Sequence, residues 1–210
     1  LPFEHRVRDD AGFVLADDTR TAAELLRNRG FATGAAVSTF LLRRDTGIAQ
    51  GFSFFDAKQP DPAVEDTPRA ERSGVDTFAA ARTWIEQQRS QRYFLFLQVD
   101  ARSANASLGG LVDTLKRTGR YDSATIVFTA DHGDGDPSLL DDTTLRVPLI
   151  IKQPAAAGAG RRIEAAVQHI DLLPTLLDVV RAPLPSGLRG RSLRPILDDD
   201  DGSVPEQPIY

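Results

Sequence analysis

The sequence predicts an α/β fold, with a mixed, mostly parallel sheet sandwiched between helices. Segments of helical periodicity alternate along the chain with short apolar runs, which is the order that parallel sheets with crossover helices produce. The run 93–99, YFLFLQV, is nearly continuously apolar, as is typical of a strand covered on both faces. A length of 210 residues suffices for one domain with a substantial core, and we therefore treat 1–210 as a single domain.

The first helix and the first strand are predicted over 19–29 and 31–40. Alanines and leucines at helical spacing give the helix an apolar stripe. Thr19 or Thr21 can cap its start, and Gly30 ends it.

The next segment reads as loop followed by helix. Residues 47–56, GIAQGFSFFD, indicate a loop with several aromatic side chains, and 57–74 is rich in proline and charge, which predicts an exposed loop. A second helix over 77–88 places Phe78 and Trp84 on one apolar face, so both are expected in the core.

Beyond the strand 93–99, a third helix is predicted over 108–118 and further strands over 125–130 and 145–152. Pro148 lies inside the last of these, and it indicates an edge strand or a bulge because proline lacks a backbone donor.

The last third of the chain contains a flexible turn at 155–160 and a helix over 171–180. Asp171 can cap this helix, and Pro174 is tolerated in its first turn. The segment 198–210 begins with a run of aspartates and is predicted to be a solvated acidic tail.

Composition excludes several classes of partner. The net charge is −5, which gives no electrostatic case for nucleic acid or an anionic membrane. No apolar run approaches the ~20 residues of a transmembrane span. The chain contains no Cys and no Met, so cysteine usage does not indicate the redox compartment, and we expect the sequence to be an incomplete translation product. No signal peptide is recognisable at Leu1.

The segment 125–135, TIVFTADHGDG, ends a predicted strand on a carboxylate and an imidazole. Ligands bind beyond the carboxyl ends of strands in open α/β sheets, and Asp131 and His132 are an oxygen and a nitrogen metal ligand. Gly133 and Gly135 would allow a sharp turn and a close approach to a ligand. The alternative is a capping aspartate beside a loop histidine. Spacing alone favours this alternative, because two ligands do not make a site.

The order of several segments resembles the sulfatase family of the alkaline phosphatase superfamily, in the part downstream of its nucleophile. These segments are TRTAAELLRNRGFATGAAVS, GIAQGFSFFD, LKRTGRYDSATIVFTADHGD, LRVPLIIKQP, VQHIDLLPTLLDVV and GLRGRSLRPIL. The likeness covers nearly all of the chain and implies a fold of the sulfatase and alkaline phosphatase type.

The resemblance implies that Asp131 and His132 are half of a divalent metal site. Calcium is the expected ion, with manganese, zinc and magnesium as alternatives. A histidine rather than an asparagine at position 132 suits a transition metal somewhat better than calcium. The family nucleophile is a formylglycine made from Cys or Ser, or a Thr or Ser in relatives. No Ser or Thr here has the required Pro and Arg after it, so the nucleophile is expected upstream of Leu1 and no catalytic residue is assigned in this chain.

The chain also departs from the family pattern. Relatives usually carry His after the strand that corresponds to 93–99, where this chain has Gln98, Val99 and Asp100. Relatives often have a further His between the Asp-His pair and the segment LRVPL, and this chain has none there. We therefore expect the loops around the site to differ from those of relatives.

Other candidate residues carry weaker expectations. His5 is a weak candidate for substrate binding, and His169 is expected to position backbone rather than bind metal. Lys152 is expected to be a solvated strand tip, and Arg146 to pair with Asp141 or Asp142. Four further cationic side chains are expected on the surface: Lys116, Arg189, Arg191 and Arg194.

The resemblance thus implies a metal-dependent sulfuric ester hydrolase, of which this chain is an incomplete part, acting on a small-molecule or saccharide sulfate ester. Two alternatives stay open: a phosphate or phosphonate ester hydrolase of the same superfamily, and a catalytically inert sulfatase-like domain or fragment. The resemblance is compatible with a periplasmic or secreted protein, but nothing in the sequence decides the compartment.

Overall fold

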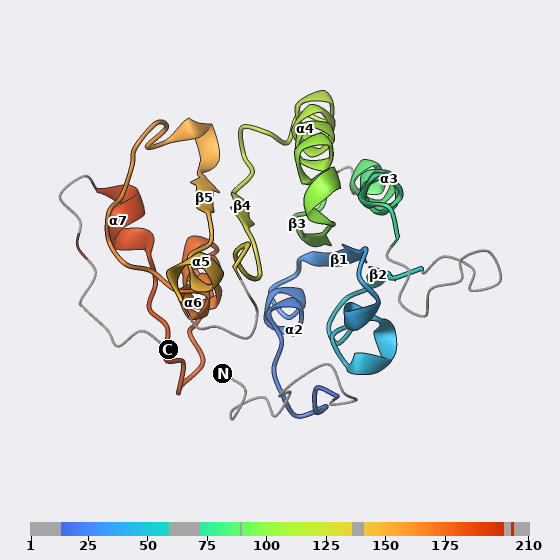
Figure 1. The fold of residues 1–210 in the computed structure, drawn as a ribbon, viewed down its shortest axis with the longest axis horizontal. Helices are drawn as coiled ribbons and strands as arrows, with labels where there is room; N and C mark the ends of the chain where they lie inside the picture. The colour runs from blue at the N-terminus through green and yellow to red at the C-terminus, as the bar shows by residue number, and fades with distance from the viewer. Residues whose placement is uncertain (1–13, 59–71, 89, 136–140, 200–202, 204–210) are drawn as a thin grey trace.

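The structure is a computed structural model that describes residues 14–58, 72–88, 90–135, 141–199 and 203 (Figure 1). It confirms the predicted α/β class: a three-stranded parallel sheet and a two-stranded antiparallel pair are combined with helices. Most of the predicted exposed loop and most of the predicted acidic tail lie outside the described residues.

The parallel sheet has the strand order β2–β1–β3, with β1 (Ala32–Val37) in the centre. β2 (Phe54–Asp56) pairs with β1 from Gly34↔Phe54 onward, and β3 (Tyr93–Gln98) pairs along all of β1. The prediction that 47–56 is entirely loop is therefore wrong at its end. Three residues there become strand because the open edge of β1 offers them partners.

The short helix α2 (Ala22–Arg27) precedes β1 and is shorter than predicted. Thr21 caps it, and Glu24 returns a hydrogen bond to the Thr21 N–H, which completes a capping box. Gly30 follows with φ +80°, a left-handed conformation in which glycine is not strained.

The long helices α3 (Gly74–Gln87) and α4 (Ala101–Arg117) pack together beside the parallel sheet (Figure 1). As predicted, Phe78 and Trp84 are core residues, and Trp84 is only 6% exposed. Trp84 stacks on Phe54 with a centroid distance of 5.8 Å. A Cβ at Gly34 would lie 2.7 Å from the Trp84 ring, so the glycine on β1 provides the space that the indole fills.

The second part of the structure is built on β4 (Ile126–Thr129) and β5 (Leu149–Lys152), which pair antiparallel from Ile126↔Lys152 to Thr129↔Leu149. The predicted strand over 145–152 is shorter because Asp142–Leu145 forms the one-turn helix α5. Pro148 immediately precedes β5, which is an edge strand of this pair, in agreement with the prediction.

Two helices complete this part, α6 (Leu172–Val179) and α7 (Arg194–Asp198), and Figure 1 shows them near β4 and β5. Four 3-10 turns occur among the described residues: η1 (Phe40–Leu42), η2 (Arg44–Thr46), η3 (Pro154–Ala156) and η4 (His169–Asp171). Within the described part of the chain, no helix combines the length and the apolar character that crossing a membrane would require.

Two polar residues have roles that differ from the predictions. Asp171 does not cap α6 with its side chain; it is fully buried, and its carboxylate accepts hydrogen bonds from the backbone N–H groups of Gln168 and Arg191, both at 2.9 Å. Lys152 is no solvated tip, since its Nζ donates to the carbonyl oxygens of Tyr121 and Ala124 and lies 4.5 Å from the Tyr121 ring centroid. Lys152 thereby ties the end of β5 to the turn before β4.

Candidate functional site

The segment that follows β4 is the candidate site. β4 ends at Thr129, and Asp131 and His132 follow it after the single residue Ala130. Their side chains are 86% and 66% exposed, so both are available to a ligand from solvent. This placement is the carboxyl end of a strand, where α/β folds bind ligands.

The local hydrogen bonds give His132 a defined orientation. Its Nδ1 lies 2.8 Å from the Gly133 carbonyl oxygen, so Nδ1 carries the proton and donates it. The hydrogen bond to Gly133 raises the pKa of His132 above its ordinary value, and the nearby carboxylates of Asp131 and Asp134 add to this effect. Nε2 is left as the free nitrogen and lies 4.0 Å from Oδ1 of Asp131.

Gly133 and Gly135 have a structural reason that differs from the predicted one. Neither is among the residues with positive φ. The Gly133 N–H donates to the Thr144 carbonyl oxygen at 2.8 Å, and a Cβ at Gly133 would lie 2.1 Å from the Thr143 carbonyl oxygen. The glycines therefore let the loop pack directly on the backbone of α5.

Helix α5 is itself held by Asp141, whose Oδ1 accepts hydrogen bonds from the Thr143 and Thr144 N–H groups at 3.0 and 3.1 Å. These bonds lower the pKa of Asp141, the largest contribution coming from the Thr143 hydroxyl. Arg146 lies 3.9 Å from the Asp142 carboxylate, the partner that the sequence suggested. The loop after β4 thus rests on a capped helical turn.

The donor set fits part of a metal site. A neutral imidazole whose second nitrogen donates to a backbone carbonyl is the usual arrangement of a metal-ligating histidine. Nε2 of His132 and the Asp131 carboxylate are the two groups that would hold an ion here. Across the residues that the structure describes, no group of three or more His, Cys, Asp or Glu side chains could hold an ion. Asp131 and His132 are therefore two candidate ligands and do not form a complete coordination shell within the described residues.

The end of β3 has no imidazole, and its polar residues have structural roles. Oε1 of Gln98 accepts hydrogen bonds from the Ser38 and Thr39 N–H groups, both at 3.0 Å, at the end of the neighbouring strand β1. Asp100 caps α4 by accepting from the Ser103 N–H at 3.1 Å. The residues that stand where relatives usually carry His thus fasten β1 to β3 and begin a helix.

One contact at the site was not foreseen from the sequence. Nε2 of His169, in η4, lies 3.2 Å from the Thr129 hydroxyl at the end of β4. The sequence favoured a positioning role for His169 over metal binding, but the two residues are 40 positions apart, and no spacing rule connects them. His5, the weak candidate for substrate binding, lies outside the described residues.

The surface cations behave largely as expected. Arg194 pairs with Asp178 and Asp198 at 3.3 and 2.8 Å. The Nζ of Lys116 lies 5.2 Å from the Tyr121 ring centroid. The backbone N–H of Arg191 donates a hydrogen bond to the carboxylate of the buried Asp171. These residues have structural partners and do not join the candidate site.

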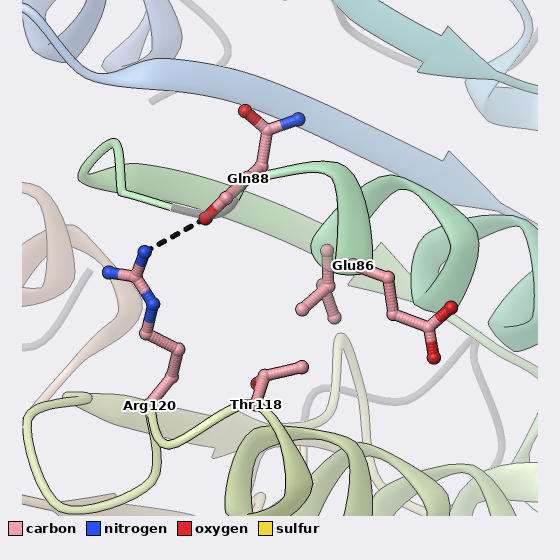
Figure 2. Close-up of a pocket in the computed structure, with 5 residues that line it drawn as sticks. Glu86, Gln88, Thr118 and Arg120 are labelled. Atoms are coloured by element: carbon pink, nitrogen blue, oxygen red, sulfur yellow. Dashed lines mark hydrogen bonds between the residues drawn. The ribbon is translucent and has the colours of Figure 1, made fainter.

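Two hollows lie near the ends of the strands that are opposite to the candidate site. Figure 2 shows the first, a volume of about 210 Å³ lined by residues that include Gln88 and Arg120; Arg120 donates to the Gln88 carbonyl oxygen at 2.8 Å. The second, of about 330 Å³, is lined by Arg29, Phe31 and Arg92 among others. These residues follow helices and precede β1, β3 and β4. They therefore lie at the amino ends of the strands, away from Asp131 and His132.

Comparison with known proteins finds a family that is similar to the part of the chain that contains the candidate site. The Sulfatase family model matches residues 100–182, from the cap of α4 through Asp131 and His132 to the end of α6. Over this region the chain is similar to sulfatases. The metal-ligand candidates Asp131 and His132 therefore fall inside the matched region.

Two curated proteins are similar to parts of this chain. The chain is 33% identical over 131 residues to an N-acetylglucosamine-6-O-sulfatase of Bacteroides thetaiotaomicron. This alignment covers 59% of the chain and 22% of that protein. The chain is 34% identical over 121 residues to the multifunctional alkaline phosphatase superfamily protein PehA of Trinickia caryophylli, covering 54% of this chain and 23% of that protein. The matched segments thus span less than a quarter of these relatives.

Solved structures show the same fold. A protein in complex with its substrate D-glucosamine-2-N,6-O-disulfate superposes with a TM-score of 0.77 at 17% identity, over 97% of this chain and 69% of that one. The phosphonate monoester hydrolase of Silicibacter pomeroyi superposes with a TM-score of 0.72 at 18% identity, over 94% and 64% of the two chains. The chain therefore has the same fold as these two proteins.

Proposed function

We propose that the protein to which this chain belongs is a metal-dependent sulfuric ester hydrolase whose substrates are saccharide sulfate esters. The match of the Sulfatase family model to residues 100–182 supports the reaction class. The sugar-sulfatase name of the Bacteroides relative and the sulfated sugar in a structure of the same fold support the substrate class.

The observation that carries the proposal is the orientation of His132. Its Nδ1 is held by the Gly133 carbonyl at 2.8 Å, and its Nε2 stays open 4.0 Å from the Asp131 carboxylate. We propose that Asp131 and His132 are two ligands of one divalent cation. Calcium is the expected ion, with manganese, zinc and magnesium as alternatives. A bound cation in such a site supplies Lewis-acid polarisation of the ester oxygens.

The other parts of the reaction come from outside the described residues under this proposal. Attack on sulfur requires an oxygen nucleophile, which is not among the residues assigned to the site here. What this chain contributes is a rigid loop with two exposed ligands. Because α5 holds the loop from behind, its ligands need little reordering when the ion and the ester oxygens arrive.

A second candidate function is hydrolysis of phosphate or phosphonate esters. It is favoured by the close superposition on the phosphonate monoester hydrolases of Silicibacter pomeroyi and Agrobacterium radiobacter, with TM-scores of 0.72 and 0.70. Hydrolysis of an aryl sulfate at a rate well above that of the matching aryl phosphate and phosphonate supports the first candidate, and the reverse order supports the second.

The decisive variant is Asp131→Ala in the full-length protein. We expect it to lose bound metal, measured by elemental analysis after dialysis, and to lose hydrolysis of an aryl sulfate. Asp45→Ala is the matched control, because Asp45 is an exposed carboxylate on η2 whose partner is Arg43. Wild-type metal content in Asp131→Ala would refute the site. Bound metal without turnover on any of the three ester series would support an inert sulfatase-like domain instead.

A further inference from the structure

We propose that His169 is a positioning residue of the metal-binding loop. Through Thr129 it fixes the point where the chain leaves β4, and this point sets the directions of Asp131 and His132. The inference rests on the proposed metal site, and it assigns a role to the motif VQHIDLLPT that the site described above does not use.

The contact joins the two motifs directly. Nε2 of His169 lies 3.2 Å from the Thr129 hydroxyl oxygen, a distance at the long end of the hydrogen-bond range. Thr129 is the last residue of β4 and pairs with Leu149 at the start of β5. Pro148 precedes Leu149 and has no N–H, so it cannot donate to extend the ladder by another residue.

The chain beyond Thr129 depends on few contacts. Among the described residues, Ala130, Asp131 and His132 make no backbone–backbone hydrogen bond, and the next one is the Gly133 N–H to the Thr144 carbonyl oxygen at 2.8 Å. Three residues, two of them the candidate ligands, thus span two anchors. The Gly133 anchor is α5, and the Thr129 anchor is the end of β4 together with His169.

The segment that presents His169 is itself firmly held. The buried Asp171 accepts hydrogen bonds from the Gln168 and Arg191 N–H groups, both at 2.9 Å. The Thr175 hydroxyl donates to the Asp171 carbonyl oxygen at 2.6 Å. A Cβ at Gly190 would lie 1.9 Å from the Ile170 carbonyl oxygen. The backbone around His169 therefore has little freedom, and the imidazole is a fixed point for Thr129.

A direct ligand role is the competing explanation for an imidazole in this place. The described residues contain no cluster of three metal-ligating side chains, so His169 does not join Asp131 and His132 around one ion. It acts through Thr129, as residues behind the ligands of a metal site commonly do.

The test uses the full-length protein with His169→Leu, His169→Gln, Thr129→Val and Thr129→Ser. In the metal-free protein, we expect faster amide exchange and shifted amide resonances at 130–132 in the Leu and Val variants. Their Mn²⁺ dissociation constants should rise about 10-fold, the lower end of the loss that such outer contacts cause. The Gln and Ser variants keep a polar group and should bind Mn²⁺ close to wild type.

Thr83→Val is the control, because it removes another threonine side-chain bond, from the Thr83 hydroxyl to the Ala79 carbonyl oxygen on the exposed side of α3. It should change neither readout. Wild-type exchange and Mn²⁺ binding in His169→Leu would overturn the inference, and so would equal losses in Leu and Gln. If Asp131→Ala keeps its Mn²⁺, the metal site itself is refuted, and the exchange data from metal-free protein still decide whether His169 holds the loop.

Discussion

The Asp100 carboxylate accepts a hydrogen bond from the Gly74 N–H at 3.1 Å, which links the start of α3 to the start of α4. Its other oxygen accepts from the Ser103 N–H, also at 3.1 Å, and caps α4. One side chain therefore satisfies backbone donors at two helix N-termini. Partial burial alone would raise the pKa of Asp100, but the hydrogen bonds from Ser103 and Gly74 outweigh it and lower the pKa.

We predict that Asp100→Ala lowers the free energy of unfolding by about 1–2 kcal/mol, because loss of a capping side chain costs this much. Urea denaturation followed by circular dichroism measures the change. Asp76→Ala, in the first turn of α3, is a control that keeps both bonds of Asp100. An Asp100→Ala midpoint equal to that of wild type would show that water replaces the carboxylate without loss.

The lowered pKa of Asp100 also predicts a pH dependence. A carboxyl whose pKa is lower in the folded state stabilises the fold above its unfolded pKa of about 3.9, and this contribution disappears as the pH falls through the folded pKa. Wild type should therefore be more stable than Asp100→Asn at pH 6, and the difference should shrink as the pH approaches 3. A constant difference between the two urea midpoints would contradict the assignment.

Two glycine substitutions should have opposite effects. Gly133→Ala would bring a Cβ to 2.1 Å from the Thr143 carbonyl oxygen, so we expect a loss of about 1–3 kcal/mol and weaker metal binding. Gly109 lies within α4, and a Cβ added there would meet no neighbouring atom within 4 Å, so Gly109→Ala should gain about 0.5–1 kcal/mol. Thermal denaturation of both variants is the measurement. A neutral Gly133→Ala would mean that the loop can move away from α5.

The end of β3 offers a further test. Gln98→Leu removes the acceptor of the Ser38 and Thr39 N–H groups, and we expect it to cost about 1–3 kcal/mol. Gln98→Glu keeps an acceptor oxygen and should stay near wild type at pH 7. Denaturant midpoints compare the two variants, and equal losses would contradict the role assigned to the acceptor oxygen.

Long periodic segments were predictable from the sequence. The apolar face of α3 and the run in β3 were found because their spacing depends only on neighbouring residues. The start of α4 was placed at Leu108 instead of Ala101, since the segment ARSANAS has no apolar stripe and its signal is the cap at Asp100. β2 was missed because three residues become strand only through pairing with β1.

The position of the candidate site was predictable from the sequence, but the contacts that hold its residues in place were not. The sequence placed Asp131 and His132 after a strand, and the structure has them just beyond the end of β4; their role as metal ligands came from the family resemblance. Packing of Gly133 on α5 and the contact of His169 with Thr129 depend on how distant segments return to β4. No local sequence pattern predicts how these distant segments pack against the end of β4. Only the structure therefore reveals what holds Asp131 and His132 in place.

The strand edges have a practical consequence for anyone who purifies this chain by itself. Among the described residues, β2, β3, β4 and β5 each pair on one side only, and Ile150 on β5 is 59% exposed. Open edges with exposed apolar side chains recruit strands from other molecules. The working concentration, more than the melting temperature, will limit how long such a preparation stays monodisperse.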